Sequence, residues 1–202
     1  MRGLLWKDLK NLKHQVVIYA FMATIWFIVS LVNWDASFLG GVLMMLSVIM
    51  PITAMGYDER AKWDRYALTM PVSRADLVVS KYLLGGLFTL FGAIFTTVIS
   101  LLLTGDAVKS LLTVLFLFSL GLFFLSVILP FMFKFGVEKG RFMLMAIALL
   151  PTALILFLSE NAIPSPSDTT LMGLSFLAPV LAVAALAVSL AVSLAIYRRK
   201  EF

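Results

Sequence analysis

The chain contains no cysteine and only one histidine, His14. The lack of cysteine excludes disulfides, thiolate metal sites and cysteine nucleophiles. His14 lies close to several lysines, so we expect a solvated interfacial group rather than a metal ligand or a general base. Charged residues are scarce too, since they make up 13% of the 202 residues, about half of what a soluble domain carries. The composition therefore leaves no room for a separate soluble domain.

We expect no acidic side chain deep inside a span, because all eleven Asp and Glu residues fall in predicted loops or near the ends of apolar segments. Ion-coupled carriers normally keep carboxylates or histidines inside the membrane to bind the coupling ion. Intramembrane hydrolases need a metal site, paired acids or a serine–histidine pair at the same depth. A glycine-rich phosphate loop of the Walker type is also missing. The sequence therefore argues against an enzyme, a resident cofactor or metal, and a self-powered transporter.

Apolar residues are abundant and make up 62% of the composition. They gather in six segments, each close to the roughly 20 residues that a helix needs to cross a bilayer. Only helices satisfy the backbone hydrogen bonds of such segments in lipid. We therefore expect an all-α polytopic membrane protein with a single transmembrane domain over residues 1–202. The six predicted transmembrane helices are 16–34, 38–57, 82–103, 108–133, 142–158 and 171–197.

The basic residues predict the orientation of these helices. All but one of the sixteen Lys and Arg residues fall on one side of the predicted topology, and Lys109 is the exception. Cytoplasmic loops of membrane proteins carry the excess of Lys and Arg. We therefore expect a multi-pass protein of a bacterial plasma membrane, with both termini and the connection between spans two and three in the cytoplasm. The net charge of +5 reports this topology, and we expect no nucleic-acid partner.

The first residues, 1–15, predict an amphipathic helix that lies in the membrane interface. Leu5, Leu9, Leu12 and Val16 recur at helical spacing and would form its apolar face. Lysines on the opposite face would lie among anionic headgroups. The candidate interfacial residues are Trp6, Lys7, Lys10 and Lys13.

Residues 58–76 form a polar element between spans two and three. Trp63, Tyr66, Ala67 and Met70 would share one face of a helix over 58–70. The opposite-charge pairs Asp58–Lys62 and Arg60–Asp64 have i,i+4 spacing, which supports a helix.

The same element predicts where this helix stops and the next one begins. Pro71 would end the first helix, and Ser73 with Asp76 predicts a capping box that starts the next. We interpret the element as a docking site for a separate motor protein. The alternative is an interfacial helix that only stabilises the fold.

Small residues recur every four positions in two predicted spans. Gly85, Thr89, Ala93 and Thr97 do so in the third span. Ala187, Ala191 and Ala195 do so in the sixth, with Ala185, Ser189 and Ser193 beside them. Such residues let helices approach closely in lipid. We expect packing within the chain, and a dimer seam or a substrate path stays open as an alternative.

The phrase Leu68-Thr69-Met70-Pro71-Val72-Ser73-Arg74 before a span, together with the basic N-terminus and the six spans, resembles permeases of the ABC-2 transporter superfamily. Small six-span subunits without an outer domain, such as those of phenol-soluble-modulin-type peptide exporters, are the most similar type. The resemblance implies that 58–69 is a coupling helix docking in a groove of an ATPase subunit, which would bind ATP and Mg. It also implies that 3–14 is an elbow-like interfacial helix and that two permease copies or paralogues assemble with two ATPases. The candidate docking residues are Asp58, Glu59, Arg60, Lys62, Trp63, Asp64, Arg65 and Tyr66.

These observations predict a permease subunit of an ABC-2 type exporter that is not itself an enzyme. The uncharged interior, rich in Phe, Met and Leu, favours a hydrophobic or amphipathic substrate such as a peptide. Two alternatives remain from the sequence: a membrane scaffold that recruits a cytoplasmic partner without transport, and an ion-coupled secondary transporter.

Overall fold

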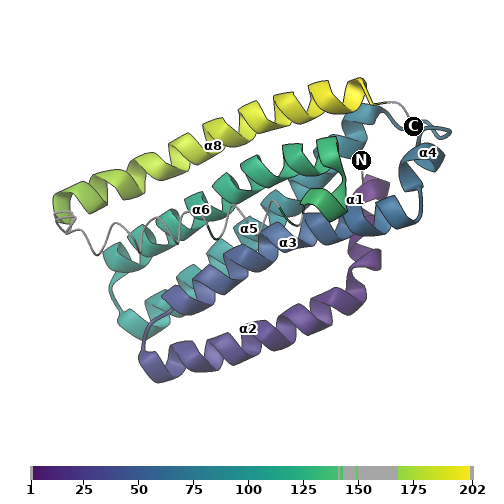
Figure 1. The fold of residues 1–202 in the computed structure, drawn as a ribbon. Helices are drawn as coiled ribbons and strands as arrows, with labels where there is room; N and C mark the ends of the chain where they lie inside the picture. Colours follow the sequence, from purple (N-terminus) through teal and green to yellow (C-terminus); the bar gives the residue numbers. More distant parts are fainter. Residues whose placement is uncertain (1, 141, 143–148, 150–167, 201–202) are drawn as a thin grey trace.

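The structure is a computed structural model, and it describes residues 2–140, 142, 149 and 168–200. All the secondary structure in this part of the chain is helical. The long helices lie side by side in a bundle, and α1 and α4 lie at one end of this bundle (Figure 1). The helices are α1 (Arg2–Asn11), α2 (Lys13–Asn33), α3 (Ser37–Arg60), α4 (Trp63–Ala67), α5 (Arg74–Thr104), α6 (Ala107–Phe135) and α8 (Asp168–Arg198).

Five of the described helices are long and apolar enough to cross a membrane: α2, α3, α5, α6 and the Phe176–Arg198 part of α8. The prediction of an all-α multi-pass membrane protein is therefore confirmed for the described residues. The predicted span 142–158 lies almost wholly outside them. α3 and α5 are longer than the predicted spans, because α3 continues to Arg60 and α5 already starts at Arg74.

Close approach of α3, α5 and α6 forms the centre of the bundle. A Cβ added at Gly85 of α5 would lie 2.8 Å from Leu125 of α6, and one added at Gly40 of α3 would lie 2.6 Å from Leu117 of α6. Thr89 and Ala93 are buried on the same face of α5 as Gly85. The predicted packing role of the small residues in the third span is therefore confirmed.

The small residues of α8 behave differently. Ala187, Ala191 and Ala195 are exposed, so the prediction that this stripe packs inside the chain is wrong. Ser189 and Ser193, one helical turn apart, form the buried face instead. This face is buried because both serine hydroxyls form hydrogen bonds with the Tyr82 hydroxyl, at 2.6 and 2.7 Å.

α8 runs parallel to α6. The Ser189 hydroxyl donates to the backbone oxygen of Ser126 at 2.5 Å. About two turns further along both helices, the rings of Phe133 and Tyr197 meet edge to face, with their centres 5.5 Å apart. Because the two helices run in the same direction, the end of α6 and the start of α8 lie at opposite ends of the bundle (Figure 1).

α2 lies at the edge of the bundle and packs mainly on α3. Its apolar side chains are exposed, among them Val17, Phe21 and Val32. Lipid tails are as apolar as these side chains, so such a surface is stable in a bilayer.

Both chain termini lie at the same end of the bundle as α1 and α4 (Figure 1). We call this end, with the last turn of α8, the polar end.

Candidate functional site

The connection between α3 and α5 at the polar end holds most of the predicted docking residues. α3 ends at Arg60, and Lys62 adopts a left-handed conformation with φ of 50° before the short helix α4 begins at Trp63. The prediction of one continuous helix over 58–70 is therefore wrong. The break also separates the predicted i,i+4 partners, and neither Asp58–Lys62 nor Arg60–Asp64 is among the ion pairs of the described residues.

The restart of the helix agrees with the prediction. The Ser73 N–H donates to the Asp76 carboxylate at 3.1 Å, and the Asp76 N–H donates to the Ser73 hydroxyl oxygen at 3.1 Å. This capping box satisfies backbone donors that the first turn of a helix would otherwise leave unpaired. It confirms that α5 starts directly after the connection.

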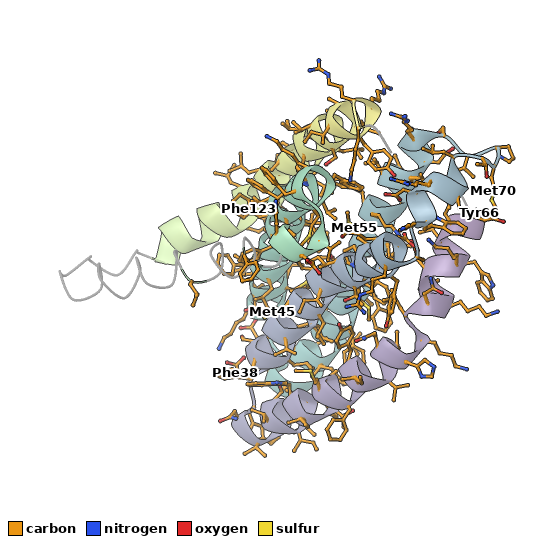
Figure 2. All side chains as sticks on the ribbon, turned by 45° about the vertical axis from the view of Figure 1, so that its right-hand side comes forward. Phe38, Met45, Met55, Tyr66, Met70 and Phe123 are labelled. Atoms are coloured by element: carbon orange, nitrogen blue, oxygen red, sulfur yellow. The ribbon has the colours of Figure 1, made fainter. Side chains whose placement is uncertain are left out.

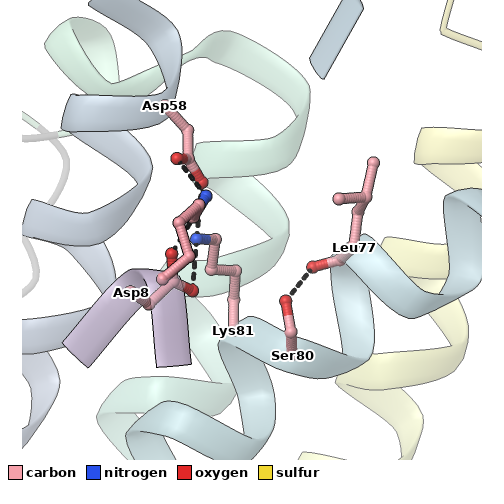
Figure 3. Close-up of polar contacts among 6 residues, drawn as sticks. Asp8, Asp58, Leu77, Ser80 and Lys81 are labelled. Carbon is pink, nitrogen blue, oxygen red and sulfur yellow. Dashed lines mark hydrogen bonds and ion pairs between the residues drawn. The ribbon is translucent and has the colours of Figure 1, made fainter. Parts of the chain in front are cut away.

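Asp58, a predicted docking residue, instead points into the bundle (Figure 3). The Lys81 ammonium lies 2.6 Å from the Asp58 carboxylate and 2.7 Å from that of Asp8. Lys7 contacts the same two carboxylates, at 2.5 Å to Asp58 and 3.1 Å to Asp8. Two acids and two bases thus form one buried neutral group, which we call the ion cluster. It ties α1, α3 and α5 together.

The ion cluster also corrects the expected orientation of the N-terminal helix. Leu4, Asp8 and Leu12, at i, i+4 and i+8, form the buried face, whereas Leu9 of the predicted apolar face is exposed. Lys7 was expected among headgroups and is instead in the cluster. The reason is that Asp58 and Lys81 from neighbouring helices offer charged partners inside the bundle.

The remaining candidate interfacial residues, Trp6, Lys10 and Lys13, are exposed, as the prediction requires.

Glu59 connects α3 to the segment after α6. Its carboxylate accepts a hydrogen bond from the Val137 N–H at 2.9 Å. Gly136, with φ of 82°, lies so close that an added Cβ would be 2.9 Å from the Glu59 carboxylate. The helical turn 137–140 begins here, and an acid at a helix N-terminus is stabilised by the unpaired N–H groups.

Asp64 and Trp63 of α4 also face the bundle. The Asp64 carboxylate interacts electrostatically with the side chain of Tyr197 at the end of α8. Burial raises the pKa of Asp64 above its ordinary value, because desolvation penalises the charged form. The Lys7 ammonium lies 4.4 Å from the centre of the Trp63 ring, a cation–π contact. Both residues therefore anchor α4 to the helices beneath it.

Arg74 joins the start of α5 to the end of α8. Its guanidinium donates to the backbone oxygen of Arg198 at 2.7 Å and to that of Lys200 at 3.0 Å. The last carbonyls of a helix lack intrahelical partners, and a cation there both pairs them and complements the helix dipole. Sequence reasoning missed this contact; the only signal was an Arg directly after the Ser that starts α5.

The predicted docking residues thus divide into two sets. The carboxylates of Asp58, Glu59 and Asp64 and the Trp63 ring make contacts with the rest of the bundle, although Glu59 itself is exposed. Arg60, Lys62, Arg65 and Tyr66 are exposed. Figure 2 shows Tyr66 and Met70 at the outer edge of the polar end. Among the described residues, no group of three or more His, Cys, Asp or Glu side chains could hold a metal ion.

A family model described as "ABC-2 family transporter protein" matches residues 3–198, nearly the whole chain. The chain belongs to the ABC-2 transporter family. No curated protein matches it. The resemblance inferred from the Leu68–Arg74 phrase is therefore confirmed, and the chain is a membrane component of a transporter.

In this ABC-2 family protein the residues of the phrase have distinct structural roles. Ser73 caps the start of α5, and Arg74 donates a hydrogen bond to a backbone oxygen at the end of α8. Ala67, just before the phrase, is fully buried against the core.

Apolar grooves lie farther along the helices of this ABC-2 family protein. One, of about 160 Å³, lies between α3 and α6 and is lined by residues such as Met44, Met45 and Phe124. A second, of about 160 Å³, lies between α2, α3 and α5.

Proposed function

We propose that the chain is the permease subunit of an ATP-driven exporter, and that a separate ATPase subunit docks on the α3–α5 connection. The observation that carries the proposal is the position of α4. It lies at the extreme of the polar end (Figure 1) and is bonded to the membrane helices beneath it. ATP and Mg would bind in the partner, because this chain has neither a phosphate loop nor, among its described residues, a metal cluster.

The proposed topology has six spans with the polar end in the cytoplasm. α6 and α8 run parallel, so the end of α6 and the start of α8 lie at opposite ends of the bundle. The apolar stretch 142–158, between them in the sequence, has the length of one further span. The bias of Lys and Arg toward the polar end supports a cytoplasmic location for that end.

Movement of a docked ATPase would reach several membrane helices through short polar contacts. Glu59 holds the end of α6 through Val137. Asp64 and Arg74 hold the end of α8, and the ion cluster holds α1 and α5. A rigid connection of this kind suits transmission by movement of whole helices.

The ion cluster bears on the alternative of an ion-coupled transporter. Asp8 and Asp58 are buried carboxylates, which such carriers use. Here, however, each carboxylate is already paired with both Lys7 and Lys81. A group that is neutral as a whole offers no net charge to attract a coupling cation, so we favour external energy from ATP.

The substrate we propose is a hydrophobic or amphipathic molecule such as a peptide. The grooves between α3 and α6 and beside α2 are lined almost entirely by apolar side chains. Two permease copies, or a copy and a paralogue, would enclose the path together with two ATPases.

The test is purification of the tagged full-length chain from its native membranes in mild detergent. We expect an ABC ATPase to co-purify in stoichiometric amount, and we expect its ATP turnover to rise when the permease is added back in nanodiscs. Transport by the isolated chain driven by an ion gradient would contradict the proposal. Stable binding of the ATPase without any ATP-dependent transport would favour the scaffold alternative.

A further inference from the structure

We propose that the exposed surface formed by Arg60, Lys62, Arg65, Tyr66 and Met70, here called the cationic tip, binds an acidic surface with an apolar pocket on the ATPase. The inference rests on the proposed function, and it adds the chemistry of the partner's surface. Its basis is that the bases of one short segment are exposed and have no ion pair among the described residues, whereas the acids of the segment make contacts within the chain.

Each acid of the segment has a contact within the described chain, although Glu59 is exposed and the Ser73–Asp76 contact lies at the surface. Asp58 pairs with Lys7 and Lys81, and Glu59 accepts from the Val137 N–H. The other two acids also have contacts: Asp64 interacts with the Tyr197 side chain, and Asp76 is in the capping box with Ser73. The segment therefore presents few free carboxylates to a partner.

The bases of the same segment face outward. Arg60, Lys62 and Arg65 are exposed, and none of them has a hydrogen bond or ion pair with another part of the described chain. Three cations without an internal acid in contact create a positive potential, which favours a surface of opposite sign. A basic groove on the partner would be repelled.

The apolar part of the cationic tip gives it an anchor. Tyr66 is 58% exposed and Met70 is 38% exposed, and both lie at the outer edge of the polar end (Figure 2). The Tyr66 ring lies 5.6 Å from that of Trp63, which is packed against the core, so its position is supported from below. Exposed Tyr and Arg side chains held in this way are typical of the residues that dominate protein interfaces.

A protein surface fits the cationic tip better than lipid headgroups do. α4 lies past the ends of α6 and α8 in Figure 1, at the extreme of the polar end. The cations of α1 and the start of α2, among them Lys10 and Lys13, are exposed nearer to the membrane helices. Those lysines are better placed to contact anionic headgroups, and they serve as a matched control.

The experiment compares two charge reversals in the full-length permease in nanodiscs. Lys62→Glu/Arg65→Glu changes the tip, and Lys10→Glu/Lys13→Glu makes the same change of charge elsewhere at the polar end. We expect the first variant to bind the ATPase at least about tenfold more weakly and with a flatter salt dependence. We expect the second to bind like the wild type. Tyr66→Ala should weaken ATPase binding without changing its salt dependence. Trp6→Ala, the matched control, should leave the ATPase affinity unchanged.

Three results would overturn the inference. If the wild type binds the ATPase and Lys62→Glu/Arg65→Glu binds it equally well, the proposed function stands and the acidic partner surface is wrong. If the wild type binds no ABC ATPase, the proposed function fails and the inference fails with it. If the tip variant keeps ATPase affinity but loses binding to phosphatidylglycerol vesicles, the tip is a lipid-binding surface. Equal melting temperatures of all variants exclude misfolding as the cause.

Discussion

The ion cluster provides the sharpest test of how the polar end is held together. Replacing Lys81 by Met keeps a side chain of similar length and removes the ammonium that lies 2.6 Å from Asp58 and 2.7 Å from Asp8. The side chains of Lys81 and Asp8 are only 6% and 1% exposed. The variant therefore leaves two buried carboxylates with Lys7 as their remaining partner.

The expected cost follows from this uncompensated charge. Removing one partner of a buried ion pair costs about 3–5 kcal/mol. Lys7 still contacts both acids, so we expect Lys81→Met to lower the free energy of unfolding by about 3 kcal/mol, the lower end of that range. The double variant Lys81→Met/Asp8→Asn is neutral again and should recover more than half of the loss.

Equilibrium unfolding in mixed detergent micelles, followed by circular dichroism, measures the difference. Lys10→Met is the matched control, since Lys10 is exposed on the same helix and should change stability by less than about 0.5 kcal/mol. Two results would refute the reasoning: a Lys81→Met midpoint equal to that of Lys10→Met, or a double variant less stable than the single one.

Three further changes test the contacts around the cluster. Arg74→Met should lower the free energy of unfolding by about 1–3 kcal/mol and make the C-terminal tail more sensitive to proteolysis. Arg199→Met, which changes an exposed neighbour, should do neither. Tyr82→Phe removes hydrogen bonds to Ser189 and Ser193 and should cost about 0.6–1.7 kcal/mol in the same unfolding assay. Because burial raises the pKa of Asp64, its contribution to stability is fully present below the unfolded pKa and is lost as pH rises through the folded pKa. Asp64→Asn should therefore flatten the fall in melting temperature as pH increases above about 4.

The features that the sequence predicted correctly depend on residues close together in the chain. The capping box of Ser73 and Asp76 spans one helical turn, so its pattern is complete within the sequence. The long apolar helices and the small-residue face of α5 follow from composition and periodicity over one segment.

The features that were missed depend on partners far away in the chain. Lys7 and Asp58 are 51 positions apart, and Arg74 contacts residues more than a hundred positions later. Nothing local distinguishes a lysine that faces headgroups from one that faces a buried acid. The one available signal was Asp8, which shares a helical face with Leu4 and Leu12. A left-handed Lys62 was not predictable, since non-glycine residues rarely adopt positive φ.

The break at Lys62 and the sorting of charge have one physical explanation. In a continuous helix over 58–70, Asp58 and Arg60 would have paired with Lys62 and Asp64 on the helix surface, and each pair would have been worth only a few tenths of a kcal/mol. Placing Asp58 between two lysines gives this acid stronger partners and a structural role. The bases lose those surface partners and remain exposed. The break thus separates charge within the segment: Asp58 is buried between lysines of the bundle, and three cations stay on the exposed surface.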